Sequence, residues 1–168
     1  PGPTLAMAAT LTGLRVGTWV YAVPVRPPWM TAWEAHSLSV LTDGGFELGI
    51  GTGRPGIAEH LRGLGIPANP GARTDQVREV VTALRALDGA DRHTPVVMAV
   101  GGPQAEALAA ELADTVTFAM AQQIERREVT MQRVRGFDNT RGLELAVHVP
   151  VIGDAPRARD PECCRRSE

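Results

Sequence analysis

Glycine occupies every second position of the stretch Gly49-Ile50-Gly51-Thr52-Gly53, which closes an apolar run typical of a strand. Side chains alternate between the two faces of a strand, so this spacing removes them from one face only. Glycine weakens a strand interior, and the pattern is typical of a place where a ligand or another backbone approaches closely. The stretch predicts either a gap for a ligand or a narrow interior across which bulky neighbours pack.

A second glycine-rich turn, Gly101-Gly102-Pro103, joins the apolar run at 96–100 to an Ala-, Leu- and Glu-rich segment. Free backbone N–H groups at a helix start favour anions, and glycine lets a phosphate approach them. The turn therefore predicts either a phosphate contact or an ordinary tight connection between a strand and a helix.

Three side chains extend this candidate site, each with a structural alternative. Trp19 could flank a flat ring or fill the core. Arg54 could contact a phosphate or substrate, or be solvated, and His148 could donate a proton or serve as a structural hydrogen-bonding residue. No carboxylate pair, nucleophile–base set or metal-ligand spacing is present, so we expect no metal and assign no catalytic residue.

The amino-acid composition argues against several classes of function. The net charge is -2, which gives no basic field for nucleic acid or an anionic membrane. There is no lysine, which excludes lysine Schiff-base chemistry. No apolar run reaches the ~18 residues of a membrane span and no signal peptide is present, so we expect a cytoplasmic protein.

The chain alternates between segments with strand and helix character. We expect strands at 14–23, 46–51, 95–100, 115–120 and 143–152, and helices at 4–12, 29–41, 57–64, 73–87, 104–112 and 122–135. This order predicts parallel strands with right-handed crossovers. A dinucleotide-binding fold is disfavoured, because the acidic residue that its fingerprint needs ~20 positions later, here Asp75, falls at a helix start.

The sequence resembles the bacterial luciferase-like monooxygenase family, which comprises flavin- or deazaflavin-dependent oxidoreductases built on an eight-stranded β/α barrel. The resemblance rests on three segments in the family's order: LRVGTWVYAVPVRPPWMTAWEAHSLSVLTDGGFELGIGTG, GARTDQVREVVTALRAL and VVMAVGGPQAEALAAELADTV. It implies an incomplete TIM-like (β/α) barrel of about five parallel strands with flanking helices over residues 1–153, followed by a flexible tail at 154–168.

The resemblance also shows what is missing. Two βα units that open a full family member are not found here, and five strands cannot close such a barrel. Exposed strand edges seek partners, so we expect a homo-oligomer or an open sheet wrapped by its own helices.

The implied ligand is FMN or a deazaflavin coenzyme, with a small-molecule substrate. If Arg15 and Glu47 pair at the amino end of the interior, Gly17 and Gly49 leave an empty layer above them for the ring. Family members commonly carry a basic residue where this chain has Gln104, beside the turn that helps to hold the cofactor phosphate. The expected cofactor-binding residues are Gly17, Thr18, Gly49, Gly51, Thr52, Gly53, Gly101, Gly102 and Pro103.

Two functions stay open. One is an oxidoreductase of luciferase-like monooxygenase type, with reduced or no activity because barrel units are missing. The other is a non-catalytic remnant that acts as an oligomeric flavin-binding or interaction module, with Trp19, Tyr21 or Met98 filling the gap above Gly49.

Overall fold

The computed structural model describes residues 2–53, 56–66, 69–119 and 124–148. Its elements, in chain order, are α1 (Gly2–Thr12), β1 (Val16–Gly17), β2 (Tyr21–Ala22), the 3₁₀ helix η1 (Val23–Val25), α2 (Pro28–Leu41), β3 (Phe46–Gly51), α3 (Ile57–Gly63), α4 (Pro70–Asp88), β4 (Val96–Val100), α5 (Pro103–Leu112), β5 (Thr115–Ala119), α6 (Ile124–Gly136) and β6 (Glu144–His148).

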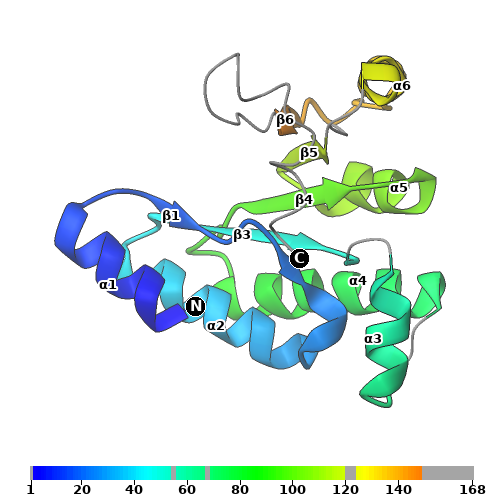
Figure 1. Ribbon diagram of the computed structural model, residues 1–168. Coiled ribbons are helices and arrows are strands. Elements are labelled where there is room, and N and C mark those ends of the chain that lie inside the picture. Colours follow the sequence, from blue (N-terminus) through cyan, green and yellow to red (C-terminus); the bar gives the residue numbers. More distant parts are fainter. Residues whose placement is uncertain (1, 54–55, 67–68, 120–123, 149–168) are drawn as a thin grey trace, which may run out of the picture.

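The strands form one parallel sheet in the order β1-β3-β4-β5-β6, with β2 also pairing to β3 (Figure 1). The order follows the sequence from one edge to the other and never reverses. A dinucleotide-binding sheet reverses its strand order at the binding crevice, so this topology rules that alternative out. The predicted partial barrel with flanking helices is confirmed.

The first expected strand, 14–23, is broken into β1 and β2 by a bulge. Gly17 lies beside Glu47, whereas Tyr21 lies beside Ile50, so four residue steps on one strand match three on the other. A cis peptide bond joins Trp19 to Val20 within the bulge. One extra residue reverses the faces of all the side chains that follow it.

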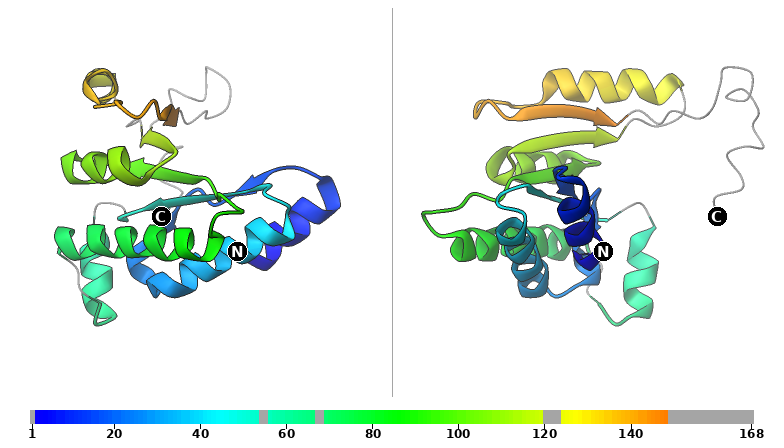
Figure 2. Two further views of the ribbon diagram at one scale, coloured as in Figure 1. Left: turned by 180° about the vertical axis from the view of Figure 1, so that it is seen from behind. Right: turned by 90° about the vertical axis from the view of Figure 1, so that its left-hand side faces the viewer.

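Helices α2, α4, α5 and α6 cover the outer side of the curved sheet (Figures 1 and 2). The alternate residues of β3 that carry large side chains, Phe46, Leu48 and Ile50, are fully buried on that side. They pack with the apolar stripe Val77, Val80, Val81 and Leu84 of α4 and with small residues of α2 and α5. The other face of the sheet carries the glycines.

Helix α4 begins at Pro70, three residues before the predicted start at Arg73. Asn69 caps it, with its Oδ1 accepting a hydrogen bond from the Ala72 N–H at 2.7 Å. Proline at the first helical position completes this start signal. The predicted strand ends at Met120 and at 149–152, and the tail at 154–168, lie outside the described residues.

A buried polar network fixes the amino ends of β4 and β5. Asp88 accepts hydrogen bonds from the Thr94 N–H at 2.8 Å and from the Thr94 hydroxyl at 3.1 Å. Its Oδ1 also lies 2.9 Å from His36 Nδ1. Arg85 donates to the Thr94 carbonyl and to Asp114, which links the two strands. Burial opposes ionisation of Asp88, but the bonds from His36 and Thr94 outweigh it and lower the pKa.

We predict that Asp88 makes the protein acid-sensitive. Because its folded pKa lies below the unfolded value of about 3.9, its contribution is present above that pH and is lost as the pH falls through the folded pKa. Asp88→Asn should lower the free energy of unfolding in urea at pH 7 and flatten its decline below about pH 4. Asp91→Asn, at an exposed carboxyl nearby, is the control and should leave the acid profile unchanged. An unaltered profile in Asp88→Asn would contradict the prediction.

Candidate functional site

A cavity of about 770 Å³ opens at the carboxyl ends of β2, β3 and β4. In parallel α/β folds this edge of the sheet is where ligands bind. Its described lining comes from the ends of these strands, from α3 and from the starts of α4 and α5: Val20, Ala22, Gly51, Thr52, Gly53, Gly56, Ile57, Ala58, Pro70, Arg73, Thr74, Ala99, Val100, Gly101, Gly102, Pro103, Gln104 and Ala105.

A row of small residues crosses the sheet at the level of this cavity. Side by side on adjacent strands lie Ala22, Gly51, Ala99, Thr117 and Ala146. Because neighbours in register share a face, the row forms one shallow, nearly featureless strip opposite the helices. Thr117 supplies its one hydroxyl, which is buried and has no hydrogen-bond partner among the described residues. Three members of the strip, Ala22, Gly51 and Ala99, line the cavity, and this part can accept a flat apolar group.

The predicted empty layer above Gly49 is filled by the protein itself. A Cβ added to Gly49 would lie 1.8 Å from the carbonyl oxygen of Thr18 and 3.1 Å from Val20 Cγ1. The Thr18 hydroxyl donates to the Gly49 carbonyl at 2.7 Å and accepts from the Gly49 N–H at 2.9 Å. The absence of a side chain at Gly49 therefore allows the bulged backbone at Thr18 to pack against β3. The expected empty layer above Gly49 is wrong.

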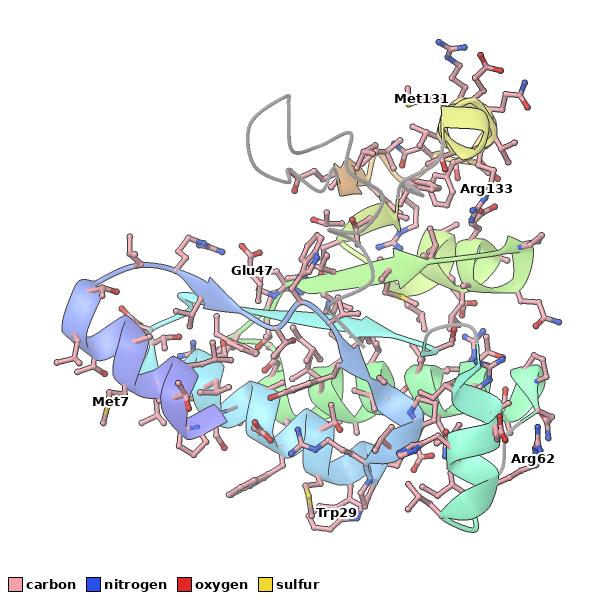
Figure 3. The ribbon with its side chains drawn as sticks, viewed as in Figure 1. Met7, Trp29, Glu47, Arg62, Met131 and Arg133 are labelled. Carbon is pink, nitrogen blue, oxygen red and sulfur yellow. The ribbon has the colours of Figure 1, made fainter. Side chains whose placement is uncertain are left out.

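The amino end of the open face matches its prediction in part. The Arg15 guanidinium donates to Glu47 at 2.7 Å, so the expected pair is confirmed. Glu47 lies on the side of β3 away from α2 (Figure 3). A Cβ on Gly17 would come within 3.0 Å of the Glu47 carbonyl oxygen. Gly17 thus allows close approach of β1 to β3.

The remaining glycines of the first motif line the cavity for different reasons. Gly51 belongs to the small-residue strip, and an added Cβ would make only ordinary contacts with Ala99 and Val20. Gly53 has a φ of +90°, and an added Cβ would lie 2.5 Å from Ile57 Cδ1. A side chain there would be strained and would collide with α3. Gly53 therefore serves the turn from β3 towards α3.

The turn after β4 is the most open part of the site. An added Cβ at Gly101 or Gly102 meets no heavy atom within 4 Å. Gly102 is the N-cap of α5 and has no side chain to bond the first backbone N–H groups. These groups have no partner within a helix and carry partial positive charge. The turn therefore has both the space and the polarity to receive an anion.

Arg73 is the charged residue of the described cavity lining, and the sequence prediction missed it. Its Nη1 donates to the Thr52 carbonyl at 3.0 Å, and its buried Nε has no hydrogen-bond partner among the described residues. The signal was available in the Asn69-Pro70 cap, which places Arg73 after the first turn of α4 and beside the end of β3. Because the helix was predicted to start at Arg73, this residue was not expected to lie one turn into the helix, beside the end of β3.

The remaining candidates, Trp19, His148 and Arg54, are not among the described lining of the cavity. Trp19 is 60% exposed in the bulge. His148 belongs to β6, beside Ala119, but its side chain lies outside the described part of the structure. Arg54 also lies outside the described residues. Six predicted cofactor-binding residues line the cavity, namely Gly51, Thr52, Gly53, Gly101, Gly102 and Pro103, whereas Gly17, Thr18 and Gly49 are not among its described lining.

Two residues expected to fill the interior face the helices instead. The Tyr21 hydroxyl donates to Glu34 of α2 at 2.8 Å, and the Arg26 guanidinium lies 5.0 Å from the Tyr21 ring centroid. Burial, reinforced by Glu34, raises the pKa of Tyr21 to about 12. Met98 is buried in the helix-side core. Neither side chain plugs the layer above Gly49.

Two features common in functional sites are not found in this part of the chain. No group of three or more His, Cys, Asp and Glu side chains among the described residues could hold a metal ion. None of the described helices has both the length and the apolar character that crossing a membrane requires.

A parallel sheet whose strands follow the order of the sequence, with a cavity at its carboxyl edge, is the arrangement of a segment of a β/α barrel. The family model for luciferase-like monooxygenases matches residues 3–159. The chain therefore belongs to the luciferase-like monooxygenase family, and the resemblance noted in the sequence is confirmed.

Curated relatives share part of this chain. Uncharacterised proteins of Mycobacterium tuberculosis and Mycobacterium bovis are 35% identical to it over 91 residues. The alignment covers 54% of this chain and 31% of each relative. The chain thus matches about a third of the length of these relatives.

Solved structures share the fold at low sequence identity. The coenzyme F420-dependent tetrahydromethanopterin reductase of Methanopyrus kandleri superposes with a TM-score of 0.64 at 19% identity, covering 87% of this chain and 52% of that one. An F420-dependent secondary alcohol dehydrogenase gives 0.59 at 19% identity, covering 84% and 52%. EDTA monooxygenase from Chelativorans sp. BNC1 gives 0.58 at 16% identity, covering 92% and 49%. The chain spans about half the length of these proteins.

We predict opposite outcomes for alanine at two glycines of the site. Gly49→Ala would drive a methyl group into the Thr18 carbonyl, so it should lower the free energy of unfolding by about 3 kcal/mol or more. Gly101→Ala enters open space and should change it by no more than about 0.5 kcal/mol. Urea unfolding followed by circular dichroism measures both. Equal effects of the two substitutions would argue against the described packing of the bulge.

Proposed function

We propose that the chain binds the tricyclic ring of FMN or a deazaflavin coenzyme and belongs to an oxidoreductase of luciferase-like monooxygenase type. The observation that carries this proposal is the cavity at the carboxyl edge, with its strip of small residues and an open anion-receptive turn. A strip without bulky side chains suits a planar ring, and the start of α5 suits a phosphate.

The titles of the fold neighbours support this ligand class. Two of them are described as F420-dependent enzymes and another as an EDTA monooxygenase. Their low identity means that they share the fold, so the ligand for this chain is inferred from its own cavity together with its family membership. The same proposal includes a location in the cytoplasm. It also includes a small molecule as the substrate.

The chain's residues would position the ring rather than react with it. Gly51 and Ala99 would lie against its face, and the Thr117 hydroxyl would donate to or accept from a polar atom at its edge. A bound flavin or deazaflavin would supply hydride transfer or oxygen activation, which is chemistry of the cofactor. The apolar strip would exclude water from that face of the ring.

Self-association is a second proposal, supported by the outer surface of the first two helices. Large apolar side chains are exposed there, including those of Met7 and Leu11 on α1 and of Trp29, Trp33 and Leu41 on α2. Figure 3 shows Met7 and Trp29 directed away from the sheet. An exposed apolar surface of this kind marks an interaction site. Sedimentation of the wild-type chain tests the proposal, and a monomer at all concentrations would refute it.

We predict that filling the strip weakens ring binding. Ala99→Leu places a larger side chain in the cavity lining and should weaken binding of FMN and of a deazaflavin by at least about tenfold, a cost of about 1.4 kcal/mol. Ala107→Leu makes the same change at an exposed position of α5 and should have no effect. Fluorescence titration measures both variants. If the wild-type chain binds neither ring at high micromolar concentration, the proposed function is wrong.

A second substitution separates binding from stability. Thr117→Val keeps the shape of the side chain and removes a buried hydroxyl that has no hydrogen-bond partner in the described part of the chain. We expect the free energy of unfolding to rise by about 1 kcal/mol, because an unsatisfied polar group is no longer buried. The affinity for the ring should fall at the same time. A variant that is more stable and binds equally well would exclude Thr117 from the ligand site.

A further inference from the structure

Helix α3 is attached to the rest of the molecule differently from the helices on the outer side of the sheet. Each of those helices is tied to a neighbour by ionisable side chains: His36 of α2 lies 2.9 Å from Asp88 of α4, Arg78 of α4 donates to Glu111 of α5 at 2.8 Å, and Arg133 of α6 donates to Glu106 of α5 at 2.7 Å. The side chains of Glu59, His60 and Arg62 on α3 have no hydrogen bond or ion pair among the described residues. Contacts of this kind therefore hold the outer helices to one another but not α3.

Two apolar side chains attach α3 to the body of the protein. Ile57 and Leu61 are buried, at 8% and 0% exposure, whereas the other residues of the helix apart from Ala58 are exposed. The backbone hydrogen bonds described at its two ends all stay within residues 56–66. A segment with few buried apolar contacts and no hydrogen bonds to its surroundings opens locally at a small cost in free energy.

Glycines with a positive φ stand immediately before α3 and shortly after it. Gly56 has a φ of +85° and Gly65 a φ of +70°. An added Cβ would meet no heavy atom within 4 Å at either position, so close packing is not the reason for glycine there. The reason is a backbone conformation that other residues rarely adopt, and a few residues of this kind absorb the change when a lid moves. Figures 1 and 2 show α3 beyond the end of β3, with its axis across that of α4.

We propose that α3 is a lid on the cavity. Its first residues, Ile57 and Ala58, line the cavity together with Gly56. In the free protein the helix opens locally about Gly56 and Gly65, and a ligand that fills the cavity closes it by contact with Ile57 and Ala58. A ligand shifts the population towards the conformation that binds it better, so filling the cavity favours the closed lid. This inference rests on the proposed function only for the ring that is used to close the lid.

Two Arg-Gly bonds at helix ends allow the opening of α3 to be measured against an internal control. Arg62-Gly63 ends α3 (Figure 3) and Arg135-Gly136 ends α6, and all four residues are exposed. Trypsin cleaves after arginine at a rate that follows the population of the locally opened chain. In the wild-type protein, cleavage at Arg62-Gly63 should be at least about tenfold faster than at Arg135-Gly136. Saturating FMN or deazaflavin coenzyme should slow the first cleavage at least about tenfold and leave the second unchanged, as measured by mass spectrometry of the fragments. Equal cleavage of the two bonds, or equal protection of both by the ring, overturns the lid.

Matched substitutions connect the opening to the residues that hold α3. Ile57→Ala removes one of its two buried attachments and should speed cleavage within the helix at least about tenfold. Leu64→Ala makes a similar truncation at a side chain that is 54% exposed, just after the helix, and should leave the rate unchanged. Gly65→Ala strains the hinge and should speed the cleavage, whereas Gly13→Ala adds the same methyl group at a φ of +65° outside the lid and should not. An unchanged rate in Ile57→Ala overturns the inference, and Gly65→Ala decides in the same way if Ile57→Ala does not fold.

Failure of the lid and failure of the proposed function are distinguishable. If the chain binds the ring and the ring gives no protection at Arg62-Gly63, the lid is wrong and the proposed function stands. If the chain binds neither ring, the proposed function is wrong and the free protein decides. Faster cleavage at Arg62-Gly63 than at Arg135-Gly136, accelerated further in Ile57→Ala, then supports the hinged helix, and equal cleavage overturns it.

Discussion

The close approach of the Thr18 backbone to Gly49 determines which side chains reach the binding face. It inserts one extra residue between Gly17 and Tyr21, so that Ala22 rather than Tyr21 lies beside Gly51. Without that residue the phenol ring would project over the strip, because a one-residue slip exchanges the two faces of a strand. The bulge instead turns Tyr21 towards Glu34 and leaves a small methyl group at the cavity.

The polar side chains at the two ends of the sheet differ in their hydrogen bonding. At the amino ends of β4 and β5, Asp88 and Asp114 bind backbone N–H groups and tie the strands to α4. At the carboxyl ends, by contrast, Thr117 and Arg73 each have a buried polar atom without a hydrogen-bond partner among the described residues. Buried polar groups that have hydrogen-bond partners stabilise a fold. A buried polar group without a partner in the protein can receive one from a bound ligand. Buried atoms of Arg26, Thr31 and Gln76, outside the described lining of the cavity, also have no partner among the described residues, so the shape of the cavity rather than the hydrogen bonding locates the site.

Periodicity in the sequence predicted the parallel order of strands and helices, whereas the partial barrel was predicted from the resemblance to the family. Each long helix and each strand from β3 onwards exists within a few residues of its predicted range, because their apolar stripes are buried against one another. The break between β1 and β2 could not be foreseen. It depends on a contact between Thr18 and Gly49, 31 positions apart in the sequence, and no local pattern encodes such a contact.

The glycines show where sequence reasoning about the site succeeds and where it fails. A missing side chain marks close approach, but it does not identify what approaches. At Gly49 the neighbour is backbone, at Gly53 it is a helix, and at Gly101 there is open space. Three similar signals thus have three physical causes, which only the fold can separate. Arg73 was missed for a related reason, since its distance from Thr52 is set by packing of α4 and not by spacing along the chain.

The cavity is built from a small part of a barrel. Its described lining runs from Val20 to Ala105 and involves three neighbouring strand positions. Closure of a full barrel needs eight strands, yet the strip and the anion-receptive turn are formed without it. The geometry of this edge of the sheet is therefore local and does not need a closed barrel. The strip and the turn depend on strand register within this segment, and the similar solved structures are about twice as long.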